Sequence, residues 1–289
     1  NTAIGRGAMI NATTAQSCVA IGDQAAQYIP AATNITHLIA IGASTLGDAS
    51  TIDTSANGGV AIGATAGNNA GPLAEEFVII GKNAGQKLNG AGVTHIGFEA
   101  GYYATGSYNT FVGADAGKGG TTSAPFSTGE RSTGVGYQAL LLQTTGGRNT
   151  AIGYQAGKAI TTATNNVLLG NGAGDDLTSG GSNVIIGADA GSNITTDAYV
   201  TAIGYVAGQY MQNAGEARYN TVVGNGSGYQ SGKGIHQTYL GAQSGFYATG
   251  SYNTFVGSDA GKGGTTSAPF SSGTYNVAMG YNALVAFTT

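Results

Sequence analysis

The sequence is poor in several residue types on which globular proteins ordinarily rely. It contains no Trp, four Pro and one Cys in 289 residues, and charged residues make up 8% of it, against about 25% in a typical soluble protein. The single Cys18 excludes an intrachain disulfide framework. Because Cys18 lies in an apolar run, we expect a buried free thiol. No apolar stretch approaches the roughly 18 residues of a membrane-spanning helix, so we expect no membrane insertion.

Charge is not only scarce but also unpatterned. Lys and Arg number 10, the formal net charge is −4, and the basic residues are scattered along the chain. A nucleic-acid-binding protein concentrates basic residues in a patch or stripe, so we expect no nucleic-acid partner. The absence of basic blocks also argues against binding to an anionic membrane surface.

Glycine, in contrast, is abundant and periodic. It accounts for 52 of the 289 residues, against a usual share of about 7%. An apolar residue followed by Gly recurs sixteen times, most often about 17 residues apart, and such a short period is typical of a solenoid. We call these the anchor glycines: Gly5, Gly22, Gly42, Gly63, Gly81, Gly97, Gly113, Gly136, Gly153, Gly170, Gly187, Gly204, Gly224, Gly241, Gly257 and Gly280.

Three positions define each repeat. The residue before the anchor is Ile, Val, Leu or Met in all sixteen copies; the third residue after it is Ala in thirteen, and the fourth is Gly in eleven. The Ala position indicates a crowded site that tolerates little more than a methyl group. The Gly positions fit turns with positive φ. Asn at the start of many repeats can support a turn or a ladder with its neighbours above and below.

The residues before each anchor predict a β-strand of about four to five residues. Val184 and Ile186 share one face of such a strand and Ile185 points to the other. Both faces are apolar, which indicates burial on both sides. One face fills the coil, and the other needs a second apolar surface, from copies packed side by side or from a two-layer monomer. We predict an all-β fold, a β-solenoid or β-roll of about 16 rungs with a repeat of ~17 residues, as one repetitive domain over residues 1–289.

Insertions and a duplication lie on this repeat. The insertions cover about residues 23–41, 118–131, 209–219 and 262–275. Residues 103–127 and 247–271 are identical except for Ala114 and Ser258. Loops on a rigid scaffold often carry function. Phe126 and Phe270, at the tips of two insertions, therefore either contact a receptor or fold back to cap the coils.

Aromatic residues are further candidates for binding. They could stack on sugars or contact a protein partner, or they could pack over neighbouring coils and chain interfaces. Four directly follow anchor glycines and four lie in or beside the duplicated segments: Tyr137, Tyr154, Tyr205, Tyr281, and Tyr102, Tyr103, Phe246, Tyr247.

The sequence offers little for catalysis. None of the three histidines, His37, His95 and His236, lies in a metal-binding spacing, and His95 occupies a strand position. Asp175 and Asp176 are weak candidates for metal ligands; a solvated turn is the favoured interpretation. Asp115, Asp189 and Asp259, each two residues after an anchor, indicate turns rather than a glycosidase pair. We expect no catalytic residue, no cofactor and no enzymatic activity.

The string Asn149–Gly157 resembles the repeats of phage tail-fibre proteins and related bacterial surface proteins, and Val19–Gly22 and Val60–Gly63 resemble head repeats of trimeric autotransporter adhesins. The resemblance covers essentially the whole chain and implies a parallel homotrimeric shaft on a virion or cell surface. Adhesin head repeats are commonly shorter than the repeat of this chain, which favours the tail-fibre branch. The self-cleaving chaperone of many such fibres is not present, and no binding residue can be transferred from the shared motif.

We therefore expect a phage tail fibre shaft in the virion that recognises a host cell-surface glycan or protein. The alternative is a bacterial surface adhesin or extracellular filament. Because the chain starts inside a repeat, we interpret it as a processed part or fragment of a longer chain. An ice-binding solenoid is disfavoured because the Thr-Thr pairs do not share one repeat position, and a polysaccharide-degrading solenoid is the remaining alternative.

Overall fold

A computed structural model describes residues 1–12, 14–28, 35–47, 58–69, 76–120, 126–211, 217–264 and 271–288. It divides into two compact units, Asn1–Arg148 and Asn149–Thr289. The strands of the first unit are β1 (Thr2–Ile4), β2 (Val19–Ile21), β3 (Ile39–Ile41), β4 (Val60–Ile62), β5 (Val78–Ile80), β6 (Thr94–Ile96), β7 (Thr110–Val112) and β8 (Thr133–Val135). Those of the second are β9 (Thr150–Ile152), β10 (Val167–Leu169), β11 (Val184–Ile186), β12 (Ala198–Ile203), β13 (Ala217–Val223), β14 (Thr238–Leu240), β15 (Thr254–Val256) and β16 (Val277–Met279).

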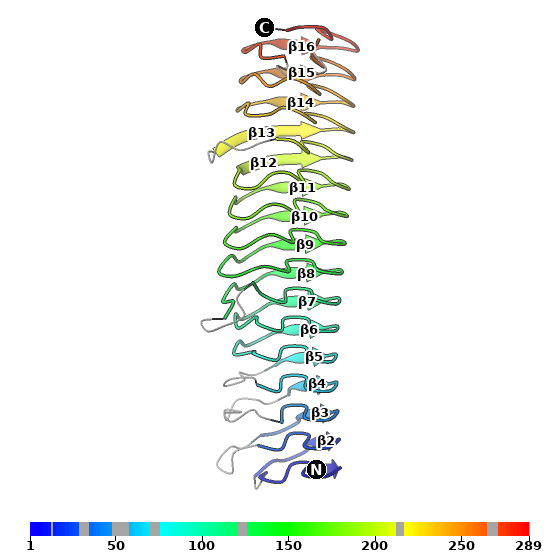
Figure 1. Ribbon diagram of the computed structural model, residues 1–289, viewed down its shortest axis with the longest axis vertical. Coiled ribbons are helices and arrows are strands. Elements are labelled where there is room, and N and C mark those ends of the chain that lie inside the picture. The colour runs from blue at the N-terminus through cyan, green and yellow to red at the C-terminus, as the bar shows by residue number, and fades with distance from the viewer. Residues whose placement is uncertain are drawn as a thin grey trace. The chain divides into compact units, whose positions relative to one another are not determined.

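Each unit is a β-solenoid with one strand per coil. Within each unit, successive strands pair in parallel and in chain order (Figure 1). Residues at the same repeat position are partners: Val167 pairs with Val184, which pairs with Thr201. The predicted all-β solenoid and the length of its repeat are confirmed. Most strands are three residues long, shorter than the four to five predicted; β12 and β13 are the longer ones.

Strands begin late because the preceding Asn bonds through its side chain. The backbone N–H of Asn183 donates to Oδ1 of Asn166 at 2.9 Å, and that of Val200 donates to Oδ1 of Asn183 at 2.8 Å. Asn166 repeats the pattern on Asn149, with its Nδ2 also donating to Oδ1 at 3.0 Å. All three amides are buried. The predicted Asn ladder is therefore present, and it continues the hydrogen bonding of the sheet beyond the strand.

The anchor glycines stack directly on one another between coils. Gly170 has a φ of +139°, outside the range that side-chain-bearing residues readily adopt. A Cβ on Gly170 would lie 2.5 Å from the carbonyl oxygen of Gly187. Conformation and close approach thus both require glycine, which explains why the anchor recurs in every repeat.

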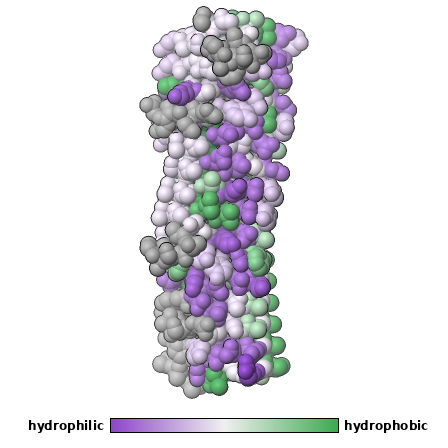
Figure 2. Space-filling model, in the orientation of Figure 1, coloured by the Kyte–Doolittle hydropathy of each residue, from purple (hydrophilic) through white to green (hydrophobic). Residues whose placement is uncertain are grey.

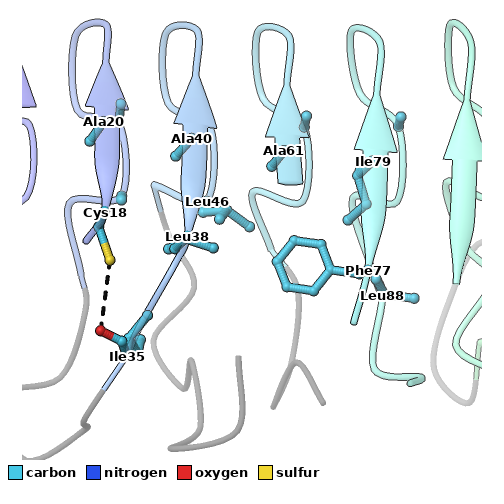
Figure 3. Close-up of a cluster of buried hydrophobic side chains, with 14 of the residues drawn as sticks. Cys18, Ala20, Ile35, Leu38, Ala40, Leu46, Ala61, Phe77, Ile79 and Leu88 are labelled. Carbon is cyan, nitrogen blue, oxygen red and sulfur yellow. Dashed lines mark hydrogen bonds between the residues drawn. The ribbon is translucent and has the colours of Figure 1, made fainter. Parts of the chain in front are cut away.

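The middle residue of each strand points into the coil and its two neighbours point out. Ile185 is fully buried, whereas Val184 and Ile186 are partly exposed. Figure 3 shows such inward side chains of the first unit, with Ala20 beside Cys18. The thiol of Cys18 is free and buried, as predicted, and contacts the carbonyl oxygen of Gln16 at 3.2 Å.

The inward strand residue and the fourth residue after the anchor share one volume. A Cβ on Gly117 would overlap the Phe111 ring of its own coil. Where the strand residue is small, as in Ala40, the fourth position carries a large side chain, Leu46, in the same left-handed conformation (φ 51°). In these coils the core is filled by exchanging size between the two positions. Where both are small, as in Ala61 and Gly67, a neighbouring coil fills the space: a Cβ on Gly67 would lie 2.7 Å from Cδ2 of Leu46.

The third residue after the anchor is the crowded site that the sequence predicts. Ala156 and Ala190 are completely buried. Where Ser244 replaces Ala, its hydroxyl is satisfied by donating to the carbonyl oxygens of Phe255 at 3.0 Å and Ala260 at 3.3 Å. A small polar side chain is thus accepted only with a backbone partner.

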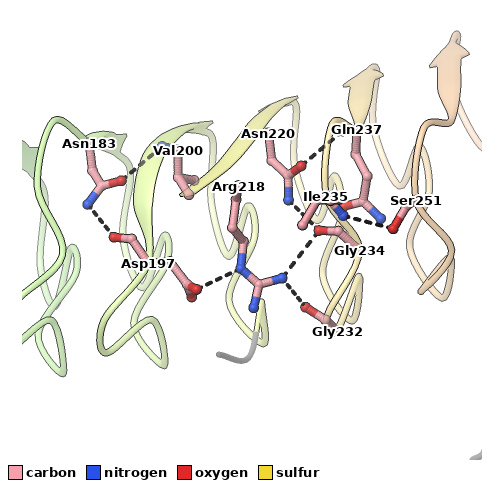
Figure 4. Close-up of polar contacts among 10 residues, drawn as sticks. All are labelled: Asn183, Asp197, Val200, Arg218, Asn220, Gly232, Gly234, Ile235, Gln237 and Ser251. Carbon is pink, nitrogen blue, oxygen red and sulfur yellow. Dashed lines mark hydrogen bonds and ion pairs between the residues drawn. The ribbon is translucent and has the colours of Figure 1, made fainter. Parts of the chain in front are cut away.

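One ion pair is buried inside the second unit. Nε of Arg218 lies 2.7 Å from Oδ1 of Asp197, and both side chains are at most 1% exposed. Nη1 of Arg218 also donates to the carbonyl oxygens of Gly232 and Gly234 (Figure 4). This pair lies where β12 and β13 exceed the usual strand length, beside the insertion at about 209–219, of which residues 212–216 lie outside the described residues.

Candidate functional site

The outer face of each sheet is made by the first and third residues of the strands. The third residue is always Ile, Val, Leu or Met, and several are well exposed, such as Ile152 at 39% and Leu169 at 42%. None of the described strands of three residues carries a charge at either position. Figure 2 shows hydrophobic residues along the edge of the first unit where, in Figure 1, its arrowheads lie. This outer face is a continuous uncharged surface within each unit.

Threonine recurs at one position of this outer face in several successive strands. Thr201, Thr221, Thr238 and Thr254 are register partners along four successive strands. The first unit repeats this in β6, β7 and β8. This array lies at a different repeat position from the adjacent Thr-Thr pairs of the sequence, so those pairs did not predict it.

A row of stacked rings lies five residues ahead of successive anchors in the second unit, within the longer strands β12 and β13 and before the strands β14 to β16. We call it the aromatic ladder: Tyr199, Tyr219, His236, Tyr252 and Tyr275. Successive ring centroids are 5.0, 5.2, 5.2 and 4.9 Å apart, with interplanar angles of 10°, 17°, 8° and 1°. The rings thus form one continuous parallel stack with the spacing of the coils.

The ladder is exposed and conformationally costly. Its tyrosines are 43% to 75% exposed. Each ladder residue has φ between 53° and 61°, a region that costs a side-chain-bearing residue about 1–2 kcal/mol. Stacking contributes about 0.5–1.5 kcal/mol per pair of rings. This gain at most balances the cost of the left-handed backbone and leaves no net stabilisation from the ladder. Other coils place Gly92, Asn165 or Ser182 at the same position, so the backbone does not require aromatic residues here.

No prediction from the sequence included the ladder tyrosines. Their separations along the chain vary with the insertions, and His236 interrupts the run of tyrosines. Alignment of all repeats on the position five before the anchor would have found them.

The aromatic candidates in and beside the first duplicated segment, residues 103–127, lie together. Tyr102 contacts Tyr103 edge-on at 4.4 Å, and Phe126 stacks on Tyr103 at 5.9 Å. Nζ of Lys87 lies 5.9 Å from the Phe126 ring centroid. All three rings are partly buried. This geometry fits the interpretation that Phe126 folds back on the coils, whereas Phe270 lies outside the described residues.

The remaining aromatic candidates separate into two groups. Phe246 stacks on Tyr229 at 4.6 Å and contacts Tyr247 edge-on at 4.7 Å, so this pair is also packed against its coils. The other group consists of exposed side chains after the strands, at the opposite end from the ladder: Tyr137, Tyr154, Tyr205 and Tyr281.

The described residues do not assemble a metal site. Among the described residues, no three His, Cys, Asp or Glu side chains lie together as metal ligands would. Burial, and then the neighbouring Asp176, raises the pKa of Asp175 to about 6. Asp115 and Asp259 each pair with the Lys three residues later, at 3.1 and 2.8 Å, in turns with positive φ. These contacts fit the interpretation of turn residues.

Comparison of the chain with protein-family models, with curated proteins and with solved structures finds no match in any of the three. In the described ranges no helix has the length and apolar character needed to cross a bilayer.

Proposed function

We propose that the chain is a structural shaft of the phage tail-fibre type, carried in the virion tail, which recognises a host surface glycan or protein and performs no catalysis. The observation that carries the proposal is the outer face of the sheet. On this face the first and third residues of the strands form two columns of uncharged, partly exposed side chains in each unit. Each outer face is covered by another copy of the chain, three copies making the fibre.

Energetics support this arrangement. Burial of apolar surface contributes about 25 cal/mol per Å², and the same small gain is repeated at every coil. The last residue of every described strand is apolar, and contiguous apolar surface marks an interface in soluble proteins. Parallel sheets are ordinarily covered on both faces. The trimer follows the resemblance of the repeats to trimeric fibres.

Molar mass in solution tests the assembly. Light scattering coupled to size exclusion should give three times the chain mass of 28.5 kDa. The variant Ile152→Lys/Leu169→Lys places two charges on the outer face and should reduce the mass to that of one chain. The control Asn171→Lys, at an exposed turn, should stay trimeric. A wild-type chain that remains monomeric at high concentration contradicts the proposal.

Recognition is tested separately. Fluorescently labelled wild-type chain should adsorb to bacterial cells and compete with phage for them. Immunogold labelling then separates phage from bacterial origin. Label on virion tails supports the tail fibre, and label on bacterial surfaces supports the alternative, an adhesin or extracellular filament.

Ice binding is a second candidate because of the Thr array at one strand position. An ice-binding face needs regularly spaced hydroxyl and methyl groups, which successive Thr partners supply. The same position carries Val in several coils, such as Val167 and Val184, which weakens the match. Absence of thermal hysteresis would remove this candidate.

A further inference from the structure

The aromatic ladder provides five aromatic contact points, four tyrosines and one histidine, at a nearly constant interval. Its rings are parallel within 17° and their centroids are 4.9 to 5.2 Å apart. We propose that the ladder binds an extended, neutral polysaccharide that lies along it with one sugar per coil. This inference rests on the proposed recognition function and specifies its site and the class of its ligand.

A ligand meets the edges of these rings rather than their faces. Tyr219, His236 and Tyr252 each have a neighbouring ring stacked on both sides. The outward surface therefore consists of ring C–H edges, phenol hydroxyls and the imidazole. Ring edges carry partial positive charge, and phenol hydroxyls both donate and accept hydrogen bonds. Such a surface suits a ligand that presents many ether and hydroxyl oxygens, as a glycan does.

The spacing favours an extended chain of equatorially linked pyranoses. One such sugar is about as long as the separation between neighbouring ladder rings. Such a chain therefore keeps each sugar level with one coil, and alternate sugars, which face the same way, present the same edge to the ladder. A glycan that coils, such as an α-linked glucan, winds away from a straight row of rings and loses this match after one or two coils.

Charge favours a neutral glycan over an acidic one. The ladder consists of four tyrosines and one histidine and contains no Lys or Arg that could pair with an acidic sugar. The guanidinium of Arg218, next to Tyr219 in the chain, is buried and paired with Asp197 at 2.7 Å. It therefore does not serve as a surface partner for an acidic sugar. The ladder also explains a conformational choice: aromatic side chains occupy left-handed positions where other coils use Gly92 or Asn165.

The test uses the full chain and a matched pair of variants. Tyr219→Asn/Tyr252→Asn interrupts the ladder twice, and Asn165, which has φ 60° at the same repeat position, indicates that the coil accepts Asn. The control Tyr28→Asn/Tyr108→Asn removes two exposed tyrosines of the first unit; Tyr108 has the same repeat position and left-handed conformation as the ladder residues. Circular dichroism and melting establish that both variants are folded.

The probes are soluble cello-oligosaccharides of two to six sugars, with maltohexaose as the α-linked comparison, measured by titration calorimetry. Affinity should rise with length up to about five sugars, and the ladder variant should lose at least about tenfold. The control should bind as the wild type does. Equal loss in the control, equal binding of maltohexaose, or no binding of cellohexaose by the wild type would overturn the inference.

Two further outcomes separate the inference from the function on which it rests. If the wild type and the ladder variant adsorb equally to cells, recognition stands and the ladder is not its site. If the ladder variant instead changes the molar mass of the assembly, the ladder is a contact between copies and the glycan proposal is wrong.

Discussion

His95 stacks on Phe111 inside the first unit, with ring centroids 5.2 Å apart and planes 23° apart. At the equivalent positions of the second unit, Tyr239 stacks on Phe255 at 5.1 Å and 8°. The hydroxyl of Tyr239 reaches the carbonyl oxygen of Ala248 at 3.4 Å, whereas both ring nitrogens of His95 are buried without a hydrogen-bond partner. Equivalent core positions thus hold His95, whose ring nitrogens have no hydrogen-bond partner, in the first unit and Tyr239, whose hydroxyl has one, in the second.

Stability of the first unit should therefore fall in acid. Burial lowers the pKa of His95 from 6.5 to about 3, so the folded chain keeps it neutral while the unfolded chain protonates it below about pH 6.5. The stability associated with neutral His95 is complete above that pH. It decreases by up to about 1.4 kcal/mol per pH unit as pH falls toward 3. His95→Tyr, which copies Tyr239, should reduce this loss, which urea unfolding at pH 7.5 and 4.5 measures.

The shared volume of Phe111 and Gly117 gives a second prediction. Gly117→Leu alone should overpack the coil and destabilise it by about 1–3 kcal/mol, in addition to the strain of a left-handed Leu. Phe111→Ala alone should cost about 3–5 kcal/mol through the cavity. The double variant copies the pair Ala40 and Leu46. Its loss of unfolding free energy should therefore be smaller than the sum of the losses of the two single variants. A double-mutant cycle that is additive would contradict the exchange of volume.

The repeat made much of the fold predictable, because one rule is used sixteen times. The anchor glycines, the buried Ala156 and the alternation of Val184, Ile185 and Ile186 follow from spacing and residue size alone. The contact of Arg218 with Asp197 did not, because 21 residues and an insertion separate the two. The ladder was not predicted for a related reason: insertions make the separations between its residues unequal, and the common position is seen only when the repeats are aligned on the anchor glycines.

The crowded Ala position gives a third prediction. Ala156→Leu or Ala190→Leu should destabilise the second unit by about 1–3 kcal/mol per chain, since both side chains are completely buried. Ala156→Ser should cost less, because Ser244 finds backbone acceptors at the equivalent position. Thermal melting compares the three variants, and an unchanged melting temperature for both Leu variants would contradict the crowding.

Asp175 should destabilise the folded chain at neutral pH. Its folded pKa is raised to about 6 by burial and by Asp176, above its usual value of 3.8. Its protonated form is therefore favoured in the fold, and stability is complete below about pH 4 and decreases as pH rises through 6. Asp175→Asn should raise the melting temperature at pH 7.5 and leave it nearly unchanged at pH 4. The exposed control Asp176→Asn should have the smaller effect at pH 7.5.

The buried pair of Arg218 and Asp197 should respond differently to single and double replacement. Arg218→Ala leaves Asp197 buried without its cation and should cost about 3–5 kcal/mol. The double variant Arg218→Met/Asp197→Ala removes both charges and keeps the apolar volume of the longer side chain. Since removal of a whole buried pair is often close to neutral, the double variant should be more stable than Arg218→Ala. Urea unfolding of the wild type, Arg218→Ala and the double variant measures the order of their stabilities. A double variant as unstable as Arg218→Ala would show that the hydrogen bonds of Arg218 to the carbonyl oxygens of Gly232 and Gly234, rather than the ion pair, stabilise this region.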